Sequence, residues 1–282
     1  MFLVLAHYDD RLAARVHERL RARHGAARAR LLTADELALG TRWALRQDGA
    51  RVDVTMRLAD DTHVRSTEID AVFNRLRFAA APHFAAAPDA DRDYALMETH
   101  AFLLSWLAAL PRVVNRASPR GLGGAVRGAA EWLLLAGRAG LPARGMRFAT
   151  SARSFPKPGF DPHIPLDGAG LAAGAVVRST SRATLGKAPA HFLEPVGGEC
   201  RRVLVIGAHA HGGDLTPALR DGCLRLAREA GCALAEFWFA RAGDGAGADA
   251  GWQFCGGSSF PADLPETETG ALVALLEAGV EG

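Results

Sequence analysis

The first 33 residues alternate between apolar and amphipathic segments in a way that fits few folds. Phe2 to Ala6 is a continuous apolar run of strand length, and Ala29 to Thr33 is a second one. Between them, Asp9 to Arg23 repeats apolar residues at the spacing of one helix face, with Asp9 or Asp10 as a capping residue. This strand–helix–strand opening predicts an α/β layer.

Further elements follow from the same periodicities. A hairpin is expected from Arg51 to Leu58 and Thr62 to Ser66, because Asp60 and Asp61 interrupt an alternating pattern. The other expected strands are Ala71–Asn74, Arg112–Asn115, Ala175–Ser179, Arg202–Ala208, Ala233–Ala240 and Trp252–Cys255. The other expected helices are Asp91–Ala109, Gly124–Ala139, Pro217–Ala230 and Thr269–Ala278.

The chain is expected to divide into three parts. Residues 1–115 form a small α/β domain, 116–174 a central helical subdomain with a loop, and 175–282 a C-terminal subdomain. The stretch Phe155 to Gly174 is rich in Pro and Gly, which favours a loop and a subdomain boundary there. The eight residues DGAGADAG, 244–251, are expected to form a flexible tip.

Charge and composition exclude several classes of function. The 33 basic and 31 acidic residues give a net charge of +2 and are spread along the chain, so no basic stripe favours nucleic acid. No stretch approaches the ~20 apolar residues of a membrane span. MFLVLAHYDD has no basic leader and is expected to be a first strand, not a signal peptide. The four cysteines lack CxxC spacing and are expected to be reduced core residues, which favours the cytoplasm.

A series of short motifs carries a resemblance to a known family. VFNRLR, VVN, a helix ending in AGLPA, AVVRS and RRVLVIG follow one another in this order. The order resembles that of the ATP-grasp superfamily, and is most similar to the branch of ribosomal-protein glutamate ligases and microviridin ligases, over nearly the whole chain. The resemblance implies that 1–115 is a pre-ATP-grasp domain and that 175–282 is an ATP-grasp-like subdomain.

The resemblance also implies a chemistry. Members of this family use ATP to phosphorylate a carboxylate, which an amine then attacks to form an amide. Cations must surround the transferring phosphoryl group because negative charge concentrates there. By similarity, Arg178 stands where the family has a lysine that contacts the nucleotide, and Arg202 matches the family arginine beside the phosphates. Lys187 lies within a shortened phosphate loop, and Glu194 or its neighbours Phe192 and Leu193 would lie at the adenine hinge.

The magnesium positions depart from the family pattern. The strand that should carry an aspartate has Trp238 at that place, with Glu236 two residues earlier on the same face. The next strand should carry a Glu and an Asn two residues apart, and by alignment it has Cys255 and Gly257, followed by Ser258 and Ser259. These residue types are poor ligands for a hard cation.

Three hypotheses follow. The first is a degenerate ATP-grasp protein, a pseudoenzyme that serves as a non-catalytic binding or partner subunit, for a catalytic ligase or for a peptide or small-molecule substrate in a biosynthetic pathway. The second is a divergent but active ATP-dependent ligase using Arg178, Lys187 and Arg202 with a shifted acid such as Glu236, Asp244 or Asp249, and with magnesium. The third is an unrelated α/β enzyme with a metal site at His209, His211 and Asp214. The resemblance is also compatible with a homodimer.

Overall fold

The computed structural model describes residues 1–49, 51–149, 161–164, 178–179, 190–193, 199–241 and 251–278. Contacts between Cα atoms divide the chain into two compact units, Met1–Val126 with Ala262–Gly282, and Arg127–Pro261. The predicted boundary at 115 precedes this division by 11 residues, the one at 174 lies outside the described residues, and the three-part division stays a prediction.

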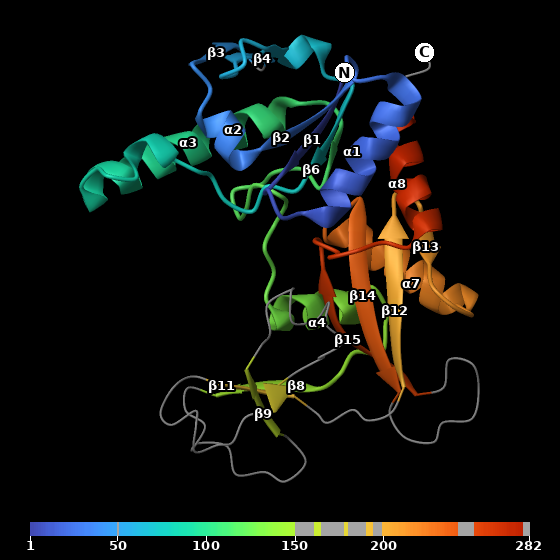
Figure 1. Cartoon of the computed structure of the whole chain (residues 1–282). Coiled ribbons are helices and arrows are strands. Elements are labelled where there is room, and N and C mark those ends of the chain that lie inside the picture. The colour runs from blue at the N-terminus through green and yellow to red at the C-terminus, as the bar shows by residue number, and fades with distance from the viewer. Residues whose placement is uncertain are drawn as a thin grey trace. The chain divides into compact units, whose positions relative to one another are not determined.

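The first unit is built on a parallel sheet in the order β2-β1-β6-β7. Its strands are β1 (Phe2–Ala6), β2 (Ala29–Thr33), β6 (Ala71–Asn74) and β7 (Val113–Val114). Helices α1 (Arg11–His24) and α8 (Glu266–Glu277) lie side by side on one face of the sheet (Figure 1). The sequence expectation of an α/β layer is therefore confirmed.

Local sequence explains how α1 begins, ends and binds α8. Asp10 caps its N-terminus, with the carboxylate accepting from the backbone N–H of Ala13 at 3.0 Å. Gly25 follows the last turn with φ of +81°, a conformation that glycine adopts without steric cost. Three arginines of α1 pair with acidic residues of the closing segment: Arg15 with Asp263, Arg19 with Glu266, and Arg23 with Glu277 at 2.7 Å. The closing helix thus packs in the first unit, although it is the last element of the chain.

Two asparagines of the VFN and VVN motifs lock the end of the parallel sheet. Asn74 is 1% exposed, and its amide nitrogen donates to the carbonyl oxygen of Leu122 at 2.6 Å and to that of Asn115 at 3.4 Å. Asn115 has φ of +56°, which asparagine tolerates better than most residues. A buried amide needs such partners, so both motifs have a structural role that does not depend on a ligand.

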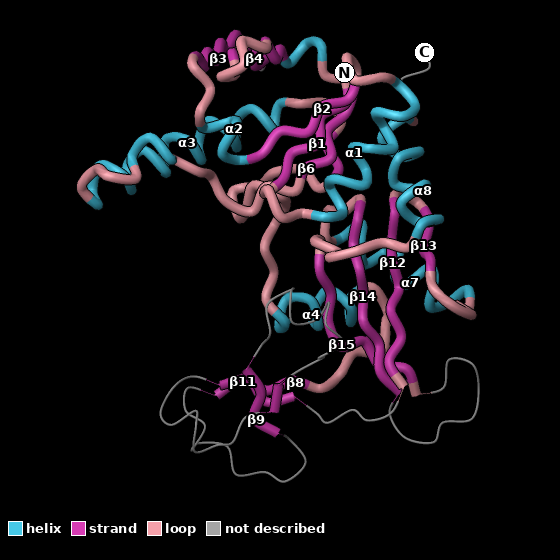
Figure 2. The backbone as a smooth tube through the Cα atoms, in the orientation of Figure 1, coloured by secondary structure: helices cyan, strands magenta, loops and turns pink. Residues whose placement is uncertain are grey.

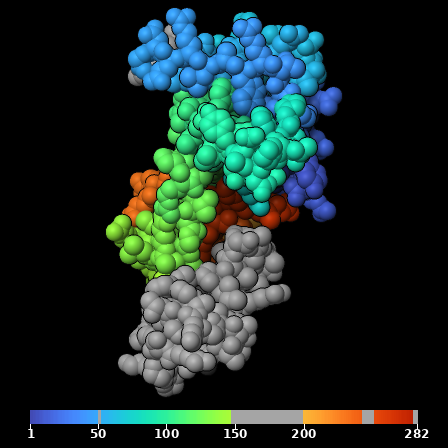
Figure 3. All heavy atoms as spheres, turned by 90° about the vertical axis from the view of Figure 1, so that its left-hand side faces the viewer, coloured from blue at the N-terminus to red at the C-terminus, as the bar shows by residue number. Residues whose placement is uncertain are grey.

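The other face of the parallel sheet is covered by a long helix and a small antiparallel sheet. Helix α3 (Asp89–Ala109) contributes Leu103, Trp106 and Leu107 to a core shared with Leu3 and Leu5 of β1. The small sheet has the order β3-β4-β5, with β3 (Arg42–Asp48), β4 (Arg51–Arg57) and β5 (His63–Arg65). Short helices complete the unit: α2 (Ala34–Ala38) and the 3-10 turns Ser66–Glu68 and Pro82–Phe84. The outer face of α3 is exposed (Figure 3).

The second unit contains an antiparallel sheet in the order β13-β12-β14-β15 (Figure 2). Its strands are β12 (Cys200–Ile206), β13 (His209–His211), β14 (Leu234–Arg241) and β15 (Trp252–Ser258). Helices α4 (Ala129–Arg138) and α7 (Pro217–Glu229) pack on one face, where Phe237, Phe239 and Phe254 form the centre of the core. The aromatic cluster at these strands is therefore core packing, except for Trp238, which lies on the opposite face.

Two predicted boundaries in this unit were wrong. The helix expected from Gly124 begins only at Ala129, because Gly124 has φ of +106° and Gly128 is extended. The strand expected to end at Cys255 continues to Ser258. A pair of glycines normally indicates a turn, but here Gly256 and Gly257 pair with β14.

A second antiparallel sheet of this unit has the order β10-β9-β11-β8. Its strands are β8 (Met146–Ala149), β9 (Asp161–Ile164), β10 (Arg178–Ser179) and β11 (Ala190–Leu193). Strand β9 falls within the stretch 155–174 that was expected to be a loop, and the rest of that stretch lies outside the described residues. The predicted tip at 244–251 also lies outside them, except for its last residue, Gly251.

The cysteines are all free, and three of them are partly or fully buried. Burial raises the pKa of Cys223 to about 12 and the pKa of Cys232 and Cys255 to about 11, so these thiols stay protonated near neutral pH. Cys200 is exposed, contrary to the expectation that all four lie in the core. Among the residues that the structure describes, no helix has the length and apolar content needed to cross a membrane.

Candidate functional site

The sheet β13-β12-β14-β15 has two chemically different faces. Residues that alternate along β12 and β14 point to opposite sides, so Val203, Val205 and Phe237 enter the core beneath α4 and α7. The register pairs Arg202 with Trp238 and Leu204 with Glu236, which places these four side chains together on the other face. We call this face, with Gly256 and Ser258 of β15, the Arg202 face.

An ion pair organises the Arg202 face. Nε and Nη2 of Arg202 both lie 2.9 Å from Oε2 of Glu236, across the two neighbouring strands. The Glu236 side chain is completely buried, whereas that of Arg202 is 28% exposed. A carboxylate taken out of water needs a compensating positive charge, and Arg202 supplies it. The resemblance implied that Arg202 lies beside the phosphates, and Glu236 was named as one possible shifted acid; the structure brings these two residues together.

Trp238 completes the surroundings of the guanidinium group. Cζ of Arg202 lies 5.7 Å from the centroid of the Trp238 ring, within the range of a cation–π contact. Trp238 is also the direct cross-strand partner of Gly256, which has no side chain to occupy the space beside the indole. An indole therefore stands at the position where the resemblance implies a magnesium-binding aspartate.

A β-bulge in β15 changes which residues reach the Arg202 face. The register shifts between Trp238 and Phe239, so that Gly256 opposes Trp238 while Phe254 opposes Phe239, and Cys255 is the extra residue. Gly257 opposes Phe237 on the core side, where an added Cβ would come within 2.9 Å of the Phe237 ring. The residues of β15 on the Arg202 face are thus Gly256 and Ser258, not Cys255 and Gly257 as the sequence alignment had it.

The described residues of the Arg202 face do not by themselves fit a magnesium ion. Magnesium prefers oxygen ligands in octahedral geometry. Trp238 and Gly256 provide no side-chain oxygen, and Glu236 already binds Arg202, which leaves the hydroxyl of Ser258. Across the described part of the chain, no group of three or more His, Cys, Asp or Glu residues is arranged to hold a metal ion.

Two histidines stand on the same face. The register of β13 pairs His211 with Leu204 and His209 with Ile206. Because Leu204 and Ile206 lie two and four residues after Arg202 on β12, both histidines point to the same side of the sheet as Arg202. Their ring centroids are 6.5 Å apart. The sequence predicted that these histidines share one strand face, and the pairing confirms it. Asp214 does not join them in a group of metal-binding residues within the described ranges, so the third hypothesis has no support from the geometry.

The other predicted site residues are not brought together with Arg202 by the described structure. Arg178 belongs to β10, whose backbone pairs with Ile164 in the other antiparallel sheet. Phe192 and Leu193 lie in β11 of that sheet. Lys187 and Glu194 lie outside the described residues, and their assignment to the nucleotide site stays a prediction.

The architecture of the whole chain defines its class. No family model matches the sequence, and no curated protein matches it. Solved structures match nearly its full length, and ATP-grasp ligases are among them. The chain has the ATP-grasp fold, as the order of its motifs predicted.

Three solved structures illustrate the similarity. The ATP-grasp ligase PsnB, complexed with a minimal precursor, is 19% identical with a TM-score of 0.67, and 98% of each chain is covered. A RiPP-associated ATP-grasp ligase from Chryseobacterium gregarium, in complex with ADP and a leader and core peptide, is 12% identical with a TM-score of 0.71, covering 98% of this chain and 96% of that one. The macrocyclase MdnC from Microcystis aeruginosa MRC, bound with precursor peptide MdnA, is 13% identical with a TM-score of 0.68, covering 98% and 99%.

Proposed function

We propose that this chain is a divergent ATP-dependent carboxylate–amine ligase that modifies a peptide. The observation that carries the proposal is the Arg202–Glu236 pair, since it places a cation and a carboxylate on one face of an ATP-grasp sheet. The similar ligases named above are complexed with precursor peptides, and one also with ADP, which supports a peptide substrate and a nucleotide.

The role proposed for Arg202 follows from its geometry. Its guanidinium group is held from one side by Glu236 and lies against Trp238, yet part of the side chain remains exposed. An arginine fixed in this way has lost much of its rotamer freedom before a ligand arrives, and the planar guanidinium group suits phosphate oxygens. Arg202 would thus bind the phosphates of the nucleotide, while Arg178, Lys187 and Glu194 would complete the nucleotide site.

A magnesium ion at this site would need oxygen ligands from residues outside the Arg202 face. Bound magnesium would neutralise phosphate charge during phosphoryl transfer. Because the Arg202 face offers few oxygen ligands, we propose that Asp244 or Asp249, which lie in the stretch 242–250 outside the described residues, supply the missing acids. An acid from a partner protein would serve the same purpose.

A second candidate function is favoured by the same face. Trp238 occupies a position where the family pattern has an acid, and Gly256 opposite it has no side-chain oxygen, which suits a non-catalytic subunit that binds a peptide or a catalytic ligase. Such a subunit would retain the fold and lose metal-dependent turnover.

Titration with ATP separates the two functions. We expect ATP with magnesium to bind the purified chain with measurable heat in isothermal titration calorimetry, and to bind at least tenfold more weakly, about 1.4 kcal/mol, without the metal. We expect Arg202→Lys to weaken binding less than Arg202→Gln, because the lysine keeps the charge but not the planar fork.

The outcome decides between the candidates. Binding that requires magnesium, followed by ADP release when a peptide with acidic and lysine residues is added, supports the ligase. Absence of heat up to millimolar nucleotide contradicts it and favours the non-catalytic subunit, which is then sought through its partner.

A further inference from the structure

A cavity opens at the carboxyl edge of the parallel sheet in the first unit. Its volume is about 430 Å³, and the segments that follow β1, β2 and β6 supply its walls. A water molecule needs only about 10–15 Å³ of such space, so the cavity accommodates a ligand much larger than one ion. In α/β sheets, ligands bind at the carboxyl ends of the strands, which is where this cavity lies.

A buried ion pair forms a rigid part of the cavity wall. Nε of Arg75 donates to Oδ2 of Asp10 at 2.6 Å, and the two side chains are 3% and 10% exposed. The other carboxylate oxygen of Asp10 caps α1. This pair ties the segment after β6 to the start of α1, and its opposite charges largely cancel for a ligand.

His7 contributes a hydrogen-bond donor without a charge. Its Nε2 accepts from the backbone N–H of Arg77 at 3.0 Å, and its ring stacks on Phe78 with centroids 4.0 Å apart. Partial burial and the nearby Arg77 lower the pKa of His7, while Asp9, Asp10 and Asp35 oppose that shift. With Nε2 as acceptor, the neutral imidazole carries its proton on Nδ1.

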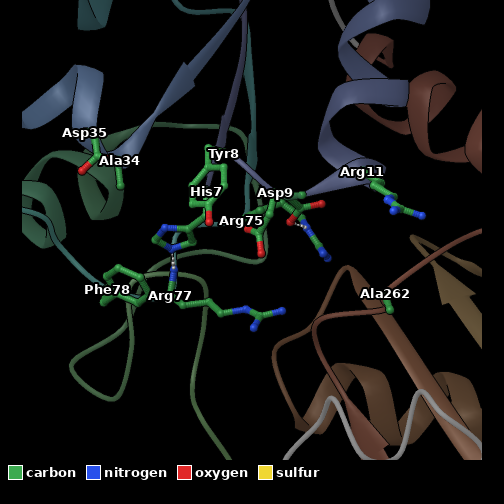
Figure 4. A pocket seen from close by; sticks show the side chains of 11 residues that line it. His7, Tyr8, Asp9, Arg11, Ala34, Asp35, Arg75, Arg77, Phe78 and Ala262 are labelled. Atoms are coloured by element: carbon green, nitrogen blue, oxygen red, sulfur yellow. Dashed lines mark hydrogen bonds and ion pairs between the residues drawn. The ribbon is translucent and has the colours of Figure 1, made fainter.

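Outside the Arg75–Asp10 pair, the cavity is lined by charges of both signs. The acids are Asp9 and Asp35, and the bases are Arg11 and Arg77. Figure 4 shows Asp35 at one side of the cavity and Arg11 at the other, with His7 between them. A simple anion would be repelled by the two carboxylates, and a simple cation by the two guanidinium groups. A ligand that carries both charges a short distance apart complements both.

We infer that this cavity is a docking pocket for a peptide segment that carries an acidic and a basic side chain close together. The acidic side chain binds at Arg77 and Arg11, the basic one at Asp35 and Asp9, and Phe78 covers part of the apolar surface between them. All residues that line this pocket belong to the first unit. The inference rests on the proposed function only in choosing a peptide as the ligand.

The test uses blocked peptides and the full-length chain without nucleotide. The probe is the acetylated, amidated hexapeptide Gly-Glu-Gly-Gly-Lys-Gly, compared with versions in which Gln replaces the Glu, the Lys or both. We expect calorimetry at low salt to show about tenfold tighter binding of the doubly charged peptide than of either singly charged one. We expect Asp35→Asn and Arg77→Gln each to lower its affinity about tenfold.

Matched controls carry the same charge changes away from the pocket. Asp48→Asn and Arg46→Gln lie on the exposed strand β3 of the same unit and should leave affinity within about twofold. Circular dichroism and the thermal midpoint check that each variant folds. Equal affinity for the four peptides, a preference for the purely acidic or purely basic peptide, or equal effects of pocket and control variants would overturn the inference. Because no nucleotide is present, this result is independent of the ATP titration.

Discussion

Replacing Arg202 with methionine is expected to lower the free energy of unfolding by about 3 kcal/mol. The change removes the ion pair of a carboxylate that is completely buried, while keeping most of the apolar length of the side chain. Breaking a buried pair by deleting one partner costs about 3–5 kcal/mol, and the partial exposure of Arg202 favours the lower end of that range. Urea unfolding followed by circular dichroism, analysed by linear extrapolation, measures the loss.

The design of this experiment includes a neighbouring control and a double-mutant cycle. Arg201→Met removes an arginine of the same strand that lies over Trp252 and not beside a buried acid, so a loss of about 1 kcal/mol or less is expected. Glu236→Gln combined with Arg202→Met should be less destabilising than the sum of the single changes, by more than about 1 kcal/mol. Simple additivity would show that the two residues do not depend on each other.

Restoring the missing acids on the Arg202 face is expected to create or strengthen magnesium-dependent ATP binding. The triple variant Trp238→Asp, Gly256→Glu and Ser258→Asn places three oxygen ligands on adjacent strands of this face. Removing the indole makes room beside Gly256, its direct cross-strand partner. We expect at least a tenfold gain in affinity for ATP with magnesium, about 1.4 kcal/mol, in calorimetry.

The matched control uses the positions that sequence alignment alone would choose. Cys255→Glu with Gly257→Asn puts polar side chains at the bulge and into the core, where a Cβ on residue 257 meets Phe237 and Trp132. Overpacking and a buried amide together should cost about 3 kcal/mol or more of stability without any gain in metal binding. A folded triple variant with no magnesium dependence, or a stable control variant that binds magnesium, would contradict the placement of the site.

Much of the fold could be predicted, because hydrophobic periodicity and capping residues in short segments indicate most of its strands and helices. The opening strands and α1 have hydrophobic periodicities, and α1 has an N-terminal cap, so these elements can be predicted from local sequence alone. The asparagines of the VFN and VVN motifs lie at the end of the parallel sheet, where Asn74 binds the carbonyl oxygen of Leu122. Strand β3 was missed because nearly all of its residues are exposed, so it has no apolar alternation. The start of α4 was misplaced because the positive φ of Gly124 does not appear in the hydrophobic pattern.

At the candidate site, too, part of the arrangement could be predicted from the sequence and part required the structure. The resemblance drew attention to Arg202 and Trp238, and strand alternation predicted that Glu236 shares a face with Trp238. The sequence could not reveal that Arg202 binds Glu236, since that pairing depends on the register between β12 and β14. It also could not reveal the cavity at His7, Asp35 and Arg77, whose walls come from three separate strand ends.

The sequence by itself determined the class of fold, through the order of its strands, helices and motifs. The tertiary structure alone decided which side chains meet. A single extra residue at Cys255 moves Gly256 and Ser258 onto the Arg202 face and turns Gly257 into the core, because side chains alternate along a strand and a bulge reverses that alternation. A bulge forms through pairing with the neighbouring strand, and no local pattern in the sequence specifies that pairing.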